Sequence, residues 1–472
     1  MSMSDTSPIN LSPQVKSEWI KWGITIALPL LFLMVPTSEA YTQDLRTFFI
    51  ITTFVILLLA FDLVDMMIPS VLLSFLYFLS GIAPVNVAFG AWTNTTTWMV
   101  LGAVILAFVL DEIGLLQRIA MQCICKCGGT FTGTMYGVFL AGCVDSFITF
   151  SQAFIIMIAL TYGICRAIKL EKSLNSTLMC FAGMLGAITT CVYIYNPAYL
   201  GLGEAGVRTI MPDFRIYWYD QLFYNGLYFF FSMGLIWGVS KFFHTDKITF
   251  EGGAKYFHEQ LAKLGPMTVR EKKSLFIVGM LMVYLLAGPV HKLPPAYGFM
   301  IFPMLLFFPG FRVGTSDSLR RINFGVIFFV AGCLSIGIVA SHLHAEQLVS
   351  KIVAPMLAGQ NSLIALVLML TIGAICNLFL TPYAMMAALG MPFATLATDI
   401  GIQPMASIMT LVISTDVIFL PHEAAGYVLM YSFGILSMGH FVKLYALKSI
   451  LMYLFFIALV YPLWQICGFV HM

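Results

Sequence analysis

Four ionisable side chains lie within or beside apolar stretches of this chain, namely Asp145, Asp416, His422 and Glu423. A charge at the centre of a bilayer costs roughly 2.5–3.5 kcal/mol on insertion scales, so such residues usually face a wet cavity and serve a function. A desolvated carboxyl group either holds a cation or takes up a proton. We predict one of these roles for Asp145, although an aspartate that caps the helix after it would fit the same position equally well.

Two motifs resemble metal sites but lack part of the pattern. His422-Glu423 begins like the zinc motif H-E-x-x-H, yet no second histidine follows at the helical spacing, which excludes a metalloprotease of that type. Cys123, Cys125 and Cys127 alternate without the paired C-x-x-C or histidine spacing of a closed zinc site, so we predict no metal there. His422 is predicted either to donate a hydrogen bond to an anion or to pack as a neutral histidine.

Hydroxyl and amide side chains gather near the same apolar segments. A small anion would find its donors among them, together with helix N-termini, without meeting a full positive charge. No Lys or Arg lies at either of the tips Phe147-Ile148-Thr149 and Pro382-Tyr383-Ala384, which predicts weak and exchangeable binding of a carboxylate. Tyr383 either donates its hydroxyl or packs as an aromatic ring. The predicted substrate-binding residues are Ser146, Thr149, Asn196, Thr381, Tyr383 and His422.

The composition of the chain indicates which solvent surrounds it. The chain is 60% hydrophobic and 10% charged, whereas a soluble domain is about 45–50% apolar and about 25% charged. A net charge of +2 does not favour a nucleic-acid partner. We therefore predict an all-α polytopic protein in a lipid bilayer. Its polar N-terminus lacks a signal-peptide core, so we expect the first apolar segment to be retained.

Apolar segments of about twenty residues are long enough to cross the hydrocarbon core as helices. Full-length candidates are 18–36, 44–62, 67–83, 98–114, 218–240, 273–290, 296–310, 321–342 and 446–468. Four further apolar segments are interrupted by polar residues or proline, and broken backbone at membrane depth must line a cavity or be buried. Two are predicted re-entrant hairpins, 130–166 interrupted at Asp145-Ser146 and 358–399 interrupted at Thr381-Pro382. Two are predicted discontinuous helices, 174–211 broken at Asn196-Pro197 and 404–441 broken at Pro421-His422-Glu423.

The order of these segments repeats in residues 44–240 and 273–468. Paired interruptions in two halves indicate the binding site of a transporter. With the N-terminus inside, about eleven spans leave Arg46, Arg208, Arg215, Lys292 and Lys351 outside, which is 5 of the 24 Lys and Arg residues. Lys448 is then expected on the cytoplasmic side. One extra span at the N-terminus precedes two halves of five spans each. Because five is odd, the two halves have inverted orientations in the membrane, and because the total is odd, the C-terminus lies outside. The linker 241–272 is expected to hold an interfacial helix at 247–265, or else an ordinary loop.

The sequence resembles the divalent anion/sodium symporter family, the solute carrier 13 class, over nearly its whole length. The likeness is carried by Leu101-Gly102-Ala103, by the run from Glu112 to Ala120, by Gly183 and Gly186, by Met391-Pro392-Phe393-Ala394, and by the run from Phe419 to Gly434. The resemblance implies an elevator-type carrier, usually dimeric, in which substrate carboxylates and sodium ions meet at the hairpin tips and helix breaks.

The chain departs from the family pattern at these same positions. The family tips read Ser-Asn-Thr, whereas the counterparts here read Phe147-Ile148-Thr149 and Pro382-Tyr383-Ala384. The first break keeps Asn196, with Thr189 also in place, and the second reads Ala424-Ala425-Gly426-Tyr427. A sodium site needs several hard oxygen ligands, so the coupling ion is expected to be either sodium or a proton. The predicted coupling residues are Asp145, Thr189, Asp416 and Glu423.

The function that these observations favour is secondary transport of a small organic anion, above all a dicarboxylate, by symport or exchange. The alternative is a cation/proton antiporter of the wider ion-transporter superfamily, which the intramembrane carboxylates favour. A membrane enzyme is disfavoured, because the chain has no nucleotide-binding loop, nucleophile elbow or metal triad. No cofactor is expected beyond the coupling ion. The expected partners are the anion, the lipid of a bacterial inner membrane and a second copy of the chain.

Overall fold

The computed structural model describes residues 13–39, 41–61, 63–127, 130–152, 154–248, 253–345, 348, 355, 360–378 and 380–471. Within these residues the chain is helical, and its strand-like pairing is limited to an isolated bridge between Ile402 and His471. Five helices are long and apolar enough to cross a membrane, namely Thr95–Glu112, Phe131–Thr149, Leu174–Val207, Gly325–His342 and Met438–Ile466. The prediction of an all-α polytopic fold is confirmed, while the count of about eleven spans and the inverted relation of the halves stay predictions.

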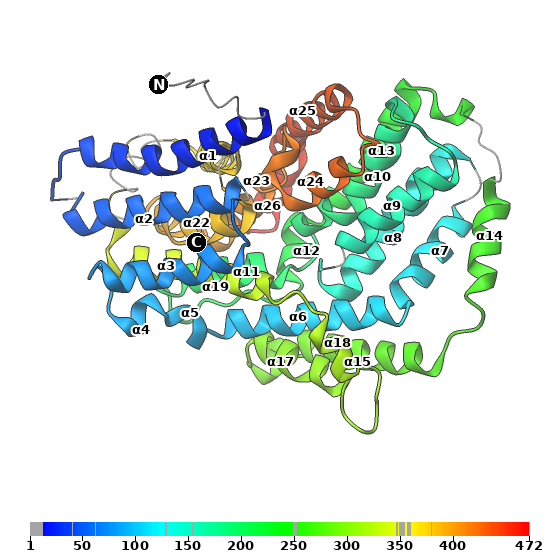
Figure 1. The fold of residues 1–472 in the computed structure, drawn as a ribbon, viewed down its shortest axis with the longest axis horizontal. Coiled ribbons are helices and arrows are strands. Elements are labelled where there is room, and N and C mark those ends of the chain that lie inside the picture. Colours follow the sequence, from blue (N-terminus) through cyan, green and yellow to red (C-terminus); the bar gives the residue numbers. More distant parts are fainter. Residues whose placement is uncertain are drawn as a thin grey trace, which may run out of the picture.

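The N-terminal part consists of consecutive helices, of which α1, α2 and α3 lie side by side in Figure 1. Their bounds are α1 Pro13–Leu30, η1 Leu31–Met34, α2 Gln43–Ala60, α3 Met67–Leu79, α4 Val85–Ala88, α5 Gly90–Thr93, α6 Thr95–Glu112 and α7 Leu115–Lys126. Asn94 begins α6, because its side chain accepts a hydrogen bond from the Thr96 amide. Gly114, at φ +77°, separates α6 from α7. Helix α7 was not predicted, and Cys123 and Cys125 lie on it.

The first hairpin is formed by α8 (Phe131–Thr149) and α9 (Phe154–Ala167). Its turn begins at Phe150 and Ser151, which have φ of +55° and +62°. The predicted interruption at Asp145-Ser146 is wrong, because both residues lie inside α8. The interruption was predicted from the polar residues Asp145 and Ser146. The chain reverses instead at Phe150 and Ser151, two non-glycine residues in the left-handed conformation. Such outliers cluster at functional sites.

The second hairpin is formed by α21 (Ser362–Asn377) and α22 (Pro382–Asp399). The predicted interruption at Thr381-Pro382 is confirmed. The Thr381 hydroxyl accepts a hydrogen bond from the Ala384 amide at 3.3 Å, and Pro382 occupies the first turn, where its missing N–H has no cost.

Two helices are broken as predicted. The first consists of α10 (Leu174–Ala187), η2 (Thr189–Val192) and α11 (Pro197–Val207), and the second of α23 (Pro404–Ser414), η4 (Pro421–Glu423) and α24 (Ala425–Ser432). The second unit ends earlier than predicted, at Ser432, and the last helix begins at Met438 instead of residue 446. That last helix runs through α25 (Met438–Phe455), η5 (Phe456–Val460) and α26 (Tyr461–Ile466).

The remaining helices join and flank these units. They are α12 Asp220–Asn225, α13 Leu227–Phe242, η3 Thr245–Lys247, α14 Gly253–Lys263, α15 Val269–Leu286, α16 Gly288–His291, α17 Pro295–Leu305, α18 Ser316–Arg320 and α19 Gly325–His342. Helix α14 confirms that the linker contains a helix, and it packs against α7 (Figure 1). Its Phe257 is completely buried.

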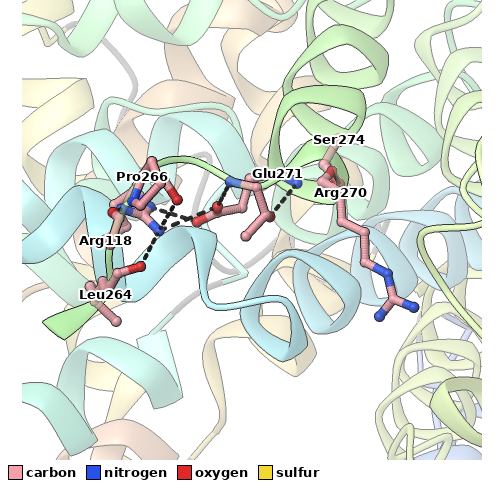
Figure 2. Close-up of polar contacts among 8 residues, drawn as sticks. Arg118, Leu264, Pro266, Arg270, Glu271 and Ser274 are labelled. Atoms are coloured by element: carbon pink, nitrogen blue, oxygen red, sulfur yellow. Dashed lines mark hydrogen bonds and ion pairs between the residues drawn. The ribbon is translucent and has the colours of Figure 1, made fainter.

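A buried ion pair attaches the linker to α7. Arg118 Nε lies 2.6 Å from Glu271 Oε1, and the side chains are 7% and 2% exposed. The same guanidinium donates hydrogen bonds to the carbonyls of Gly265 at 2.6 Å and Leu264 at 3.0 Å. Figure 2 shows these carbonyls and the carboxylate surrounding Arg118. The fork of five donors in arginine suits such a cluster of oxygens.

Candidate functional site at the helix breaks

The two helix breaks meet inside the protein. Thr189, in η2 of the first break, donates a hydrogen bond from its hydroxyl to Asp416 Oδ1 of the second break at 3.2 Å. Both residues are buried. We call residues 189–196 and 415–424 together the crossing. Non-helical backbone at this depth must be stabilised by side chains or line a cavity, so the neighbours of the crossing define the candidate site.

A buried cation lies at the crossing. Lys448 Nζ of α25 is 2.7 Å from Asp416 Oδ2 and donates a hydrogen bond to the Asp416 carbonyl at 2.9 Å. Lys448 is 0% exposed and Asp416 is 2% exposed. The Tyr427 hydroxyl donates to Asp416 Oδ1 at 3.4 Å. Lys448 was expected on the cytoplasmic side, and it is buried inside α25 at the crossing, beside the helix breaks and not at a hairpin tip.

Glu423 stabilises the second break. Its Oε1 accepts hydrogen bonds from the amides of Phe419 at 2.8 Å and Leu420 at 2.6 Å. Asn377, at the end of α21, donates from Nδ2 to Glu423 Oε2 at 3.5 Å and to the Thr415 carbonyl at 3.4 Å. The second hairpin and the second break are thereby joined. The side chain of His422 lies outside the described part of the structure.

Asn196 stabilises the first break as a helix cap. Its Oδ1 accepts hydrogen bonds from the amides of Ala198 at 3.0 Å and Tyr199 at 3.2 Å, which begins α11. Two residues of α12 satisfy further backbone groups. Gln221 accepts from the Asn196 amide at 3.3 Å, and Asn225 donates to the Val192 carbonyl at 3.0 Å. Neither was predicted, because polar residues near a helix end give no signal of what they contact.

The first hairpin also contacts the crossing. Ser146 Oγ lies 3.0 Å from Thr190 Oγ1, and Ser151 Oγ donates to the Ile194 carbonyl at 3.3 Å. The hydroxyl of Thr149 donates to the Asp145 carbonyl at 2.7 Å, within its own helix. The buried Gln152 Nε2, at the turn, has no hydrogen-bond partner in the described chain. Ser151 and Gln152 were missed because the turn was predicted several residues too early.

Asp145 is a buried carboxyl group for which the described residues provide no ion-pair partner. It is 0% exposed, and neither carboxylate oxygen has a hydrogen-bond partner among the described residues. It does not cap the second helix of the hairpin, since it lies in the interior of α8. An unpaired charge in such a place is costly, so the group is either protonated or binds a cation. Proton or cation binding at Asp145 stays a prediction.

The remaining predicted residues lie at the second hairpin. The hydroxyl of Thr381 is used in its cap. The ring of Tyr383 packs against Tyr199 of α11 and Phe329 of α19, with ring centroids 5.0 and 5.7 Å apart. Among the residues that the structure describes, no group of three or more His, Cys, Asp and Glu side chains is arranged to hold a metal ion.

The model of one known family matches the chain, and its description is that of a citrate transporter. The match covers residues 51–412, which include both hairpins, the first break and most of the scaffold around them. The chain belongs to the citrate transporter family. It is a membrane transporter and not an enzyme, as predicted, and the predicted membership of an anion-transporter family is confirmed at the level of the citrate transporters. No curated protein sequence gave a match.

Two solved transporter structures share this fold. The YdaH transporter of Alcanivorax borkumensis, whose topology is described as unusual, superimposes with a TM-score of 0.53 at 14% identity, over 97% of this chain and 99% of that chain. MtrF of Neisseria gonorrhoeae, described within a class of antimetabolite efflux pumps, gives a TM-score of 0.54 at 14% identity, over 96% and 95%. At such identity the likeness concerns the fold alone.

Proposed function

We propose that this citrate-family transporter carries a small di- or tricarboxylate by secondary active transport, with the crossing as its substrate and coupling site. The observation that carries the proposal is the buried pair of Lys448 and Asp416 at the meeting point of the two breaks. A lysine ammonium has three donors and readily exchanges one carboxylate for another. The family description names citrate, and the dicarboxylate predicted from the sequence has the same functional group.

The proposed cycle exchanges the partner of Lys448. A substrate carboxylate that approaches the crossing competes with Asp416 for the ammonium, and Asp416 is then left without its counter-charge. A buried carboxylate in that state binds a proton or a sodium ion, which links substrate binding to ion binding. Asp145 offers a second site of the same kind, because its carboxylate has no partner in the described chain.

Elevator-type movement is the transport mechanism that suits this arrangement. The hairpins and breaks contact one another through Ser146 with Thr190 and through Asn377 with Thr415, so they can move as one unit. We further propose a bacterial inner membrane, a cytoplasmic N-terminus and a homodimer. The second candidate function is cation/proton antiport, and the specific observation that favours it is the unpaired carboxylate of Asp145.

The test is uptake by purified protein in liposomes. Labelled citrate and labelled succinate are offered under an imposed sodium gradient, an imposed proton gradient or with the same anion inside, and protein-free liposomes are the control. We expect uptake of at least one anion above the control, stimulated by one gradient. If neither anion is carried in any condition while protons exchange for sodium or potassium, the antiport function replaces this proposal.

A further inference from the structure

A cavity beside the crossing, with Tyr195 in the wall between them, lies between α6, α11 and α17. Its volume is about 420 Å³, within the range of small-molecule sites, about 300–1,000 Å³. Its lining includes Asn94 and Thr95 at the start of α6, Tyr195 beside the first break, and Glu204 and Arg208 on α11. We call it the α11 cavity. Thr209, which also lines it, is exposed, so the cavity is open to the surface.

Arg208 brings donors for an anion to the α11 cavity. Arg208 Nη1 and Arg215 Nη1 each lie 3.9 Å from Glu204 Oε1, and Asp220 also acts on Glu204 electrostatically, so the cations and carboxylates around the cavity balance. Glu204 Oε2 accepts a hydrogen bond from the Ile216 amide at 3.2 Å. Arg208 donates from Nε to the Pro212 carbonyl at 3.3 Å. At 3.9 Å its terminal nitrogen is beyond hydrogen-bond distance of Glu204, so its outer N–H groups can meet a carboxylate in the cavity.

Helix termini add a positive potential. The cavity is lined by the first residues of α6 and of α17, helices of 18 and 11 residues. An N-terminus carries about half a positive charge and favours carboxylates or phosphates. At α17 the residues Pro294 and Pro295 have no N–H, so α6 is the better source of amide donors. The two helices pack closely, because a Cβ on Gly102 inside α6 would lie 1.8 Å from the Phe299 carbonyl oxygen of α17.

Aromatic side chains separate the α11 cavity from the crossing. Tyr195 lines the cavity directly before Asn196, and its hydroxyl lies 3.7 Å from Met99 Sδ. The ring of Phe299 stacks on Tyr195 at 6.2 Å and meets Phe150, at the turn of the first hairpin, at 4.6 Å. Movement of that hairpin would therefore displace Phe150 from Phe299 and alter the wall between the two sites.

We propose that the α11 cavity is a second binding site for a carboxylate anion, a vestibule that holds substrate through Arg208 before or after it passes the Tyr195–Phe299–Phe150 wall. The inference rests on the proposed function for the nature of the anion, a di- or tricarboxylate. The wall gives a reason for a second site. An anion bound in the α11 cavity lies beside the first hairpin, and movement of that hairpin would allow it to reach the crossing.

The test measures occupancy of the cavity without relying on transport. Thr209→Cys is introduced into the full-length protein together with Lys448→Met, which disables the crossing. Labelling of the introduced thiol by a thiol reagent is followed by mass spectrometry of the peptide that contains it, which distinguishes it from the native cysteines. Citrate or succinate should slow the labelling.

Two further variants identify the residue that holds the anion. Adding Arg208→Gln should weaken the protection at least about tenfold, because a hydrogen bond to a charged group is lost. Arg215→Gln is the matched control, since Arg215 contacts Glu204 but does not line the cavity. It should keep the protection.

Each outcome supports or overturns the proposal. Protection by citrate or succinate that requires Arg208 supports it, even if uptake experiments show that these anions are not transported. Protection that survives Arg208→Gln, or no protection at all, overturns it. Protection by sulfate or phosphate but by neither carboxylate also overturns it, because the cavity would then bind inorganic anions. Failure of the proposed function is seen separately, as absent uptake by the unmodified protein.

Discussion

Two buried ion pairs in this transporter differ in the groups that surround them. Arg118 and Glu271 join α7 to the linker, and backbone carbonyls of the same loop complete the shell of the guanidinium. Lys448 and Asp416 join α25 to the second break, and the carboxylate is shared with Thr189 from the other half of the chain. The linker pair is surrounded by backbone carbonyls of one loop. The crossing pair is surrounded by the Thr189 and Tyr427 hydroxyls and by the Asp416 carbonyl, so it joins three separate elements.

The difference suggests a structural role for the pair of Arg118 and Glu271 and a role in transport for the pair of Lys448 and Asp416. Burying two charges costs several kcal/mol for each ion, and only good geometry with further hydrogen bonds offsets that cost. The linker pair has such bonds from the carbonyls of Leu264 and Gly265. At the crossing, apolar side chains of similar size would often stabilise the fold equally well. A charged pair kept there is best explained by a partner exchange during transport.

The largest expected effect comes from breaking the pair at the crossing. Lys448→Met leaves Asp416 buried without its counter-charge, which costs about 3–5 kcal/mol, and removes the proposed ligand of the substrate carboxylate. We expect initial uptake of the transported anion to fall more than about 100-fold. Lys443→Met is the matched control, because Lys443 lies on the same helix but is exposed. Near-normal uptake by Lys448→Met would exclude the crossing as the substrate site.

Breaking the linker pair should affect stability instead of transport. Arg118→Met leaves Glu271 and several carbonyls unpaired, and we expect the free energy of unfolding to fall by about 3–5 kcal/mol. Uptake per folded molecule should change less than about threefold, which corresponds to under 1 kcal/mol. Thermal unfolding in detergent measures the first quantity and liposome uptake the second. Arg270→Met serves as control, since Arg270 is exposed and points away from the pair in Figure 2. Strong loss of uptake without loss of stability would contradict the comparison.

The sequence predicted the broken helices better than it predicted the charges between them. Asn196-Pro197 and Thr381-Pro382 begin helices in the structure, because an N-cap followed by proline is a local signal. Lys448 was assigned to the cytoplasmic side by counting charges in the predicted loops. Such counting contains no information on tertiary contacts, and the contact between Lys448 and Asp416 of the second break was therefore missed. The turn at Phe150 and Ser151 was missed for a related reason. Tertiary contacts hold these residues at positive φ, and their residue types alone do not favour it.

Asp145 is a further buried carboxyl group, and its oxygens have no hydrogen-bond partner in the described chain. If its proton is taken up and released during transport, Asp145→Asn keeps the shape of the side chain and removes the titration. We expect the variant to lose the stimulation of uptake by a proton gradient while it still exchanges internal for external anion. Asp399→Asn is the control, because Asp399 at the end of α22 is exposed. Unchanged stimulation in Asp145→Asn would assign proton coupling to another group.

The smallest expected effect concerns the pH dependence of the linker pair. Burial alone would raise the pKa of Glu271, but hydrogen bonds from Arg118 and Thr268 outweigh it and lower the pKa below the ordinary value of 4.5. A carboxyl group with a lowered pKa in the folded state stabilises the protein above its ordinary pKa, and this contribution is lost as the pH falls through the lowered value. The melting temperature of the unmodified protein should therefore exceed that of Glu271→Gln at neutral pH, and the difference should shrink in acid. A difference that stays constant down to unfolding would show that Glu271 acts through packing, and the contrast between the two pairs would then rest on the crossing alone.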